Sequence, residues 1–187
     1  MRKTDDDIVK RLNHIRCRYQ PVQDRICITG DLDTEAQEAF WLTQRMVTQI
    51  VPHITQYIEK QSGPKLDTLL ADVKAQLAKS QQQQADIRWR ESAKSDPAPT
   101  PPEPAATPAP WLVVKMSLAS TEAGCRLVFV GEEGDSVSVT LRLPALCRWL
   151  AVLHAQCQHA QWASAVWPAW VAGLIAAPTL PGTAVLH

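Results

Sequence analysis

The segment IRCRYQPVQDRICI, residues 15–28, decides the first part of the fold. Apolar residues alternate with polar ones on both sides of a stretch that begins with proline, which is typical of two half-buried strands joined by a turn. Pairing Cys17 with Ile28 places the apolar side chains of both strands on one face. In that register Cys17 and Cys27 point to opposite faces, so the sequence predicts no disulfide between them.

A helical hairpin is expected after this β-hairpin. Thr34 is predicted to cap the first helix, with Gln37 completing a capping box, and Gly63-Pro64 is predicted to end it. Pro52 lies inside this helix and should bend it. The apolar stripe of the first helix contains Phe40, Val47, Ile50, Val51, Ile54 and Ile58. The second helix carries Leu66, Leu69, Leu70, Val73 and Leu77 at heptad-like spacing, which favours a helix–helix contact within the chain or between chains.

A proline-rich segment divides the chain. Residues 96–110 read DPAPTPPEPAATPAP and hold half of the chain's 14 prolines, so this stretch is predicted to be extended and semi-rigid. A plain spacer is favoured over a ligand for a polyproline-binding domain. The predicted segments are therefore 1–94, a linker at 95–110, and 111–187.

The C-terminal segment predicts strands followed by a helix. Residues 111–118, 127–130 and 137–143 have strand-like apolar patterns separated by glycines, which predicts a three-stranded antiparallel meander. Pro144 is placed to begin a helix. Its inner face contains Leu146, Trp149, Leu150, Leu153, Cys157 and Ala160. The predicted fold class is α+β, with the hairpin and helical hairpin in one segment and the meander plus helix in the other.

Both halves thus predict strands followed by a helix. Each predicted helix carries a Trp-Leu pair early, at Trp41-Leu42 and Trp149-Leu150. A divergent repeat, with the two sheets joined edge to edge or packed around one core, is one interpretation of this match. Two matched residues are thin support for it, so coincidence is favoured.

The composition argues for a reducing compartment and against export. The chain has 187 residues with 19 basic and 19 acidic side chains, and its five cysteines are an odd number, which favours the cytoplasm. Asp5, Asp6 and Asp7 stand where a signal peptide needs apolar residues. The uncharged stretch 162–177 is too short for a spanning helix, although docking at a membrane interface stays open.

A metal or thiol site is one candidate chemistry. Cys147, His154 and Cys157 share one side of the last predicted helix. Zinc prefers four ligands at tight spacing, and the sequence has no C-x-x-C or H-x-x-x-H pattern, so core packing is the favoured interpretation. We expect no cofactor. A small metal or thiol protein, or an enzyme, centred on these three residues is the first alternative function.

Nucleic-acid binding is the second alternative. Arg16, Arg18 and Arg25 share the polar face of the hairpin, and Arg88-Trp89-Arg90 places an aromatic ring between two guanidiniums. Because residues 1–33 hold about as many acidic as basic side chains, an ordinary solvated strand face is the favoured interpretation.

Nucleotide-dependent chemistry through glycine-rich loops is excluded. The sequence contains neither G-x-x-x-x-G-K nor G-x-G-x-x-G, and only 7 glycines in all. Neither the cysteines nor Ser164 lies in a recognisable nucleophile motif. The sequence therefore favours a non-enzymatic protein.

Protein association is the favoured function. All 38 charged side chains lie at or before Arg148, and the uncharged remainder contains Trp162, Trp167 and Trp170. Tryptophan is enriched at interface hot spots, whose centres are depleted of charge. We therefore expect an interaction or assembly-accessory protein, oligomeric or bound to a protein partner. Its anchors would be these three tryptophans, with Phe40 and Trp41 next.

Overall fold

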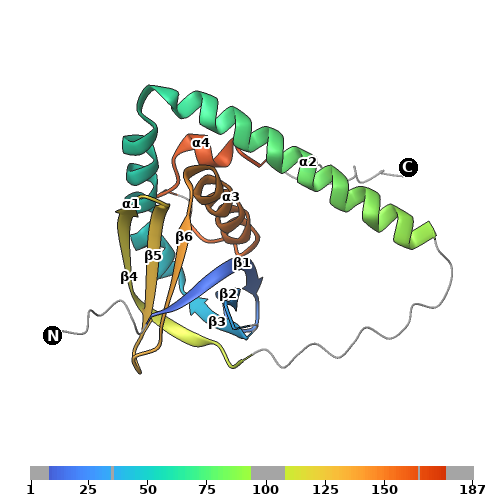
Figure 1. Ribbon diagram of the computed structural model, residues 1–187. Coiled ribbons are helices and arrows are strands. Elements are labelled where there is room, and N and C mark those ends of the chain that lie inside the picture. The colour runs from blue at the N-terminus through green and yellow to red at the C-terminus, as the bar shows by residue number, and fades with distance from the viewer. Residues whose placement is uncertain (1–8, 35, 94–107, 164, 176–187) are drawn as a thin grey trace.

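The computed structural model describes residues 9–34, 36–93, 108–163 and 165–175, with the backbone alone for 85–93 (Figure 1). The strands are β1 (Lys10–Gln20), β2 (Arg25–Leu32), β3 (Gln37–Leu42), β4 (Trp111–Thr121), β5 (Gly124–Gly131) and β6 (Ser136–Leu141). The helices are α1 (Gln44–Ser62), α2 (Leu66–Ala93), α3 (Leu143–His159) and α4 (Ala169–Ala172), with a 3₁₀ turn at Gly63–Lys65 between α1 and α2.

The six strands form one closed barrel in the order β1-β2-β3-β4-β5-β6. Consecutive strands within each half pair antiparallel, whereas β3 pairs parallel with β4 and β6 pairs parallel with β1. The expected fold class is therefore wrong. The hairpin and the meander are not separate segments, because both halves of the chain contribute strands to a single barrel. Closure gives every strand two neighbours, although the two parallel pairings are short.

The missed strand is β3. Residues 37–42 were expected to begin the first helix, but they pair with β2 and β4, and the cap of α1 is Thr43 instead of Thr34. The Thr43 Oγ1 accepts a hydrogen bond from the Met46 backbone nitrogen at 3.2 Å. Partners on both sides and a buried core face stabilise the strand here, and both are non-local features that override the local capping pattern.

The hairpin register at residues 15–28 is confirmed. Cys17 pairs with Ile28 and Tyr19 pairs with Ile26, with Cys17 and Cys27 on opposite faces. Asp24 ends the turn in the left-handed region, with φ of 48°, a conformation that aspartate tolerates better than most residues. Its carboxylate accepts a hydrogen bond from the Tyr19 hydroxyl at 2.9 Å, which ties the turn to the first strand.

The barrel consists of two βββα units of the same design. The three strands of each unit are 11, 8 and 6 residues long in the same order. Each first strand carries a register shift at the same place, after Leu12 in one unit and after Val113 in the other. A helix then begins directly after the third strand, capped by Thr43 or by Arg142.

The buried residues of α1 and α3 occupy equivalent positions in the two helices. Each of six buried residues of α1 has a buried counterpart in α3, always the same number of residues further along the chain. The pairs are Val47 and Leu146, Ile50 and Trp149, Val51 and Leu150, Ile54 and Leu153, Thr55 and His154, and Ile58 and Cys157. The Trp-Leu pairs considered in the sequence are not equivalent, because Trp41-Leu42 ends β3 and Trp149-Leu150 lies in α3. The repeat is therefore one of strand length, register and burial, which single-residue matches do not reveal.

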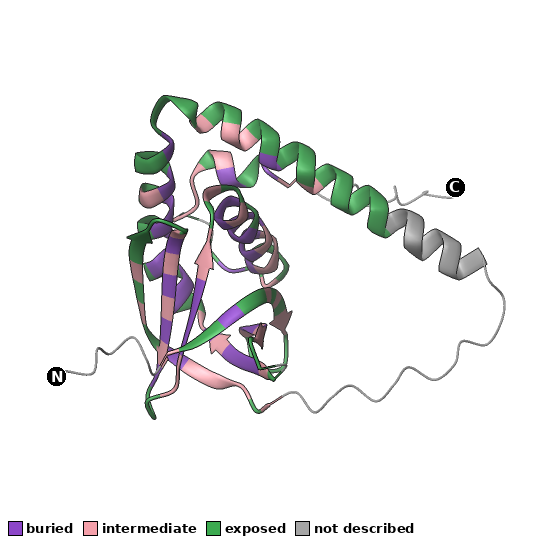
Figure 2. Cartoon of the chain, viewed as in Figure 1, coloured by how far each residue is buried: buried purple, intermediate pink, exposed green. Residues whose placement is uncertain are grey.

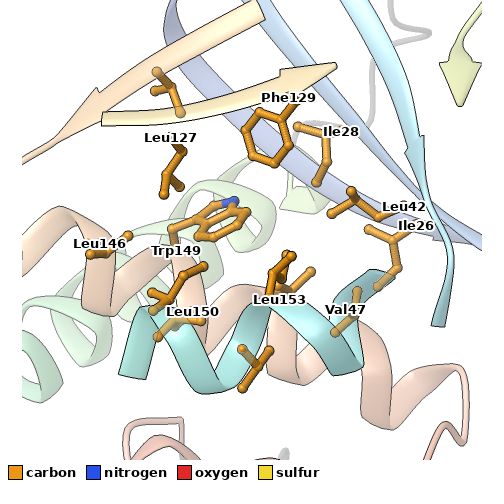
Figure 3. Packing of buried hydrophobic residues seen from close by; sticks show 14 of the residues in the cluster. Ile26, Ile28, Leu42, Val47, Leu127, Phe129, Leu146, Trp149, Leu150 and Leu153 are labelled. Carbon is orange, nitrogen blue, oxygen red and sulfur yellow. The ribbon is translucent and has the colours of Figure 1, made fainter. Parts of the chain in front are cut away.

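One hydrophobic core serves both units. Inward-facing residues of the strands, such as Ile28 and Phe129, meet residues of α1 and α3, such as Val47 and Leu153 (Figure 3). The inner face expected for α3 is confirmed at Leu146, Trp149, Leu150, Leu153 and Cys157, all of them buried. The two units therefore depend on one another for burial of their apolar side chains.

The apolar stripe of the second helix, α2, packs against the core of the same chain. Val73 is buried, and Leu66, Leu69, Leu70 and Leu77 pack half-buried against the core. Figure 1 shows α2 passing over α3 and α4 and then running on beyond them. Residues 78–84 are exposed on every side (Figure 2). None of the described helices is long and apolar enough to cross a membrane.

Candidate functional site

Trp162 is a core residue that ties the C-terminal segment to the hairpin. Its side chain is 9% exposed, its ring lies edge-on to Tyr19 with centroids 6.0 Å apart, and its Nε1 donates to Asp24 Oδ1 at 3.0 Å. Hydrogen bonds from Trp162 and Tyr19 hold the pKa of Asp24 below its ordinary value. Of the three tryptophans expected as anchors, this one is largely used inside the molecule.

Trp167 and Trp170 are half-buried and held by side chains of two helices. The Trp167 ring lies against His154 of α3, with centroids 4.9 Å apart. The Trp170 Nε1 donates to Glu59 Oε1 of α1 at 3.0 Å. Each ring is thus positioned by a polar partner while part of its surface faces solvent. Contacts of this kind restrict a side chain in the free protein, which lowers the entropy lost on binding.

A cleft of about 500 Å³ opens between α1 and the segment that carries Trp167. One wall consists of Pro52, Thr55, Gln56 and Glu59, and the other of Ala165, Val166, Trp167 and Pro168. Pro52 has no backbone N–H, so α1 lacks one helical donor on this wall. The half-exposed Trp167 and a surface of α1 with both polar and apolar residues therefore line the same cleft.

The two secondary anchors lie in different environments. Phe40 is completely buried, stacked on Trp111 with centroids 5.1 Å apart, so its ring belongs to the barrel interior. Trp41 points to the opposite face of β3 and is half-buried on the outside of the barrel. Adjacent residues of a strand point to opposite faces, which separates these two side chains.

The cysteine and histidine cluster lies in the core of α3. Cys147, His154 and Cys157 are all buried. Burial raises the pKa of Cys147 to about 11 and that of Cys157 to about 12, and it lowers the pKa of His154. The thiols are therefore protonated and the imidazole neutral at pH 7. In the described parts of the chain, no three His, Cys, Asp or Glu side chains are grouped to hold a metal ion.

Another thiol, that of Cys17, lies on β1. Burial raises the pKa of Cys17 to about 12, against a smaller opposite effect of the Trp149 indole. The Trp149 Nε1 has no hydrogen-bond partner of normal geometry, alone among the buried side-chain nitrogens and oxygens that the structure describes. We attribute this to its neighbour being a thiol, which is a weak acceptor.

The arginines of the hairpin share one face, as expected from their alternation. On the outside of the barrel, Arg16 pairs with Thr29, Arg18 with Cys27, and Arg25 with Gln20. Arg16 and Arg18 line a cleft of about 490 Å³ together with Trp41 and Pro108. Arg88, Trp89 and Arg90 lie in α2, and their side chains fall outside the described structure.

The sequence reasoning missed the α1 wall of the cleft. Thr55, Gln56 and Glu59 lie on an amphipathic helix whose polar residues carry no motif, so nothing in the sequence marks them as part of a site. The position of Glu59 beside Trp170 depends on the path of the segment after α3, which a local pattern does not specify.

No family model, no curated protein and no solved structure matches this chain.

Proposed function

We propose that this chain is a non-enzymatic interaction or assembly-accessory protein, and that its contact surface is the uncharged segment around Trp167 and Trp170. The observation that carries the proposal is the fixed, half-exposed position of these two rings, held by His154 and Glu59. Rigid aromatic side chains beside a cleft are typical of interface hot spots. The simplest occupant is a second copy of the chain, with a different protein as the alternative.

The chemistry of the buried thiols supports a binding role over a catalytic one. A cysteine nucleophile reacts as the thiolate, and burial raises the pKa of Cys147 and Cys157 well above neutral pH. All five cysteines are free. Free thiols persist in a reducing compartment, so we propose the cytoplasm as the location.

The proposed function is tested by replacing the two exposed tryptophans. Removal of everything from residue 162 onward would also remove the Trp162 contact with Asp24 and disturb the fold. The combined variant Trp167→Ala/Trp170→Ala leaves that contact in place. Its mass in solution would be measured by light scattering over a range of concentrations, beside the unmodified chain and Val22→Ala, a change at an exposed turn position.

We expect the unmodified chain and Val22→Ala to self-associate and the double variant to be a monomer with an unchanged circular dichroism spectrum. A monomeric unmodified chain would point to a different protein as occupant. In that case, quantitative affinity purification should recover a stoichiometric protein with the unmodified chain and lose it with the double variant. The proposal fails if both preparations are monomers and retain the same proteins.

A further inference from the structure

The outer face of the first βββα unit combines positive charge with an aromatic ring. Arg16 and Arg18 extend from β1 and Arg25 extends from β2, while Trp41 lies on β3, across β2 from Arg18 and paired with Cys27. We name this set the arginine–tryptophan face. Arg16, Arg18 and Trp41 line one cleft of about 490 Å³.

The acidic residues near the hairpin are directed elsewhere. Asp24 accepts from Tyr19 and Trp162, and Asp33 accepts from Asn13 Nδ2 at 2.7 Å. Within the described parts of β1, β2 and β3, the carboxylate on this face is Asp31, which accepts from Gln37 Nε2 at 3.0 Å. Three arginines therefore face one carboxylate, that of Asp31, on this surface, so the face has a net positive charge.

The second unit shows that the barrel does not require these side chains. At the strand positions equivalent to Arg16 and Arg18, it carries Ser117 and Ala119. At the position equivalent to Trp41, it carries Thr140. The same strand lengths and the same register shift form with small neutral residues at these places. In the second unit Arg126 stands at the position of Cys27, between Ala119 and Thr140, so the two units place their large side chains differently on this face. The barrel therefore does not require arginine at positions 16 and 18 or tryptophan at position 41.

We infer that the arginine–tryptophan face binds single-stranded nucleic acid. Guanidiniums contact phosphates, and an indole ring gives a base a surface on which to stack. Arg16 and Arg18 stand two residues apart on one strand, about 6.6 Å, so they can follow an extended backbone. An acidic peptide would use the charge but would leave the Trp41 ring without a stacking partner. This inference is independent of the Trp167 and Trp170 surface.

The test measures binding of a fluorescently labelled oligothymidylate of about twelve nucleotides to the full chain by anisotropy at several salt concentrations. Contacts with three phosphates predict a slope of log K against log salt of about −2. The matched variant Arg16→Ser/Arg18→Ala installs the residues of the second unit. It should weaken binding and reduce the slope to about −0.7. Trp41→Thr, also the residue of the second unit, should weaken binding about tenfold or more, and Trp41→Phe should retain most of it.

Two controls separate this inference from its alternatives. Trp167→Ala/Trp170→Ala should bind the oligonucleotide as the unmodified chain does. Oligonucleotide binding can therefore succeed or fail independently of the proposed association through Trp167 and Trp170. Polyglutamate should compete poorly. The inference is overturned if no binding occurs at low salt or if the arginine variant binds unchanged. It is also overturned if Trp41→Thr has no effect, because no base would then stack on this ring. Equal competition by polyglutamate would overturn it as well and would assign the face to acidic proteins.

Discussion

Phe40 and Phe129 meet inside the barrel with ring centroids 4.9 Å apart, one from each βββα unit. Both side chains are buried in the complete chain, and each ring contacts the ring of the other unit. The contact explains why the chain forms one barrel: each half completes the core of the other.

Truncating either ring should destabilise the whole chain. Phe40→Ala and Phe129→Ala are each expected to lower the free energy of unfolding by about 3–5 kcal/mol, because each leaves a large cavity in the shared core. Val22→Ala, at a side chain that is 92% exposed, should change it by less than about 0.5 kcal/mol. Denaturant titrations followed by circular dichroism would measure these values. A second unfolding transition in either variant would contradict the shared core.

Two glycines with positive φ give a matched pair for the packing of the second unit. A Cβ on Gly124 would lie 2.4 Å from the Leu141 carbonyl oxygen, whereas a Cβ on Gly134 would meet nothing within 4 Å. Gly134→Ala should cost about 1–3 kcal/mol from backbone strain alone. Gly124→Ala should cost clearly more, because β5 must also move away from β6. Equal losses for the two variants in thermal melts would show that the contact with Leu141 is unimportant.

Stability should fall in mildly acidic solution because of His154. Burial lowers its pKa below the ordinary value of 6.5, so the unfolded chain binds the proton more readily than the folded chain. The full contribution is present above about pH 6.5 and is lost as the pH falls through the folded-state pKa. His154→Gln should remove this part of the pH dependence, whereas His53→Gln, on the exposed side of α1, should leave it in place.

The contribution of Trp167 to the fluorescence, taken as the difference between the unmodified chain and Trp167→Phe, provides a local measurement of the same event, because its ring contacts His154. We expect the emission to change over the pH range in which stability falls. A stability profile of His154→Gln that parallels that of the unmodified chain would contradict the prediction.

A second acid-sensitive contact lies at the hairpin turn. The pKa of Asp24 is lowered by hydrogen bonds from Trp162 and Tyr19, so the folded chain favours the carboxylate. This contribution is present above the ordinary value of 3.8 and is lost as the pH falls through the folded-state pKa. Asp24→Asn keeps an acceptor and tolerates the positive φ, but it should show no such loss. Asp33→Asn, which removes an exposed contact with Asn13, serves as the control in acid titrations of stability.

The hairpin and the helix faces could be predicted because their signals are local. Alternation over residues 15–28 specified the pairing of Cys17 with Ile28, since a shift by one residue would expose every apolar side chain. The buried face of α3 followed from the spacing of its leucines. In contrast, β3 was missed because Thr34 and Gln37 form a local capping pattern and Phe40 fits a helical apolar stripe, whereas the strand is stabilised by non-local pairing with β2 and β4.

The candidate surfaces could also be predicted only in part from the sequence. Composition directed attention to Trp162, Trp167 and Trp170, but only the fold separates the buried Trp162 from the two half-exposed rings. The arginine–tryptophan face required the outward register of three strands, two of which were predicted. Trp41 was assigned to a helix by the sequence and therefore could not be placed beside Arg18.

The sequence by itself determined the first hairpin, the apolar faces of α1 and α3 and the separation of charge between the first 148 residues and the rest. These features depend on residues within a few turns or one strand pair of each other. The tertiary structure alone decided the closure of the barrel, the duplication of the βββα unit and the positions of the tryptophans. Closure depends on two parallel pairings, β3 with β4 and β1 with β6, which join residues far apart in the chain. Their stability comes from the shared core, so it is invisible until both halves are present.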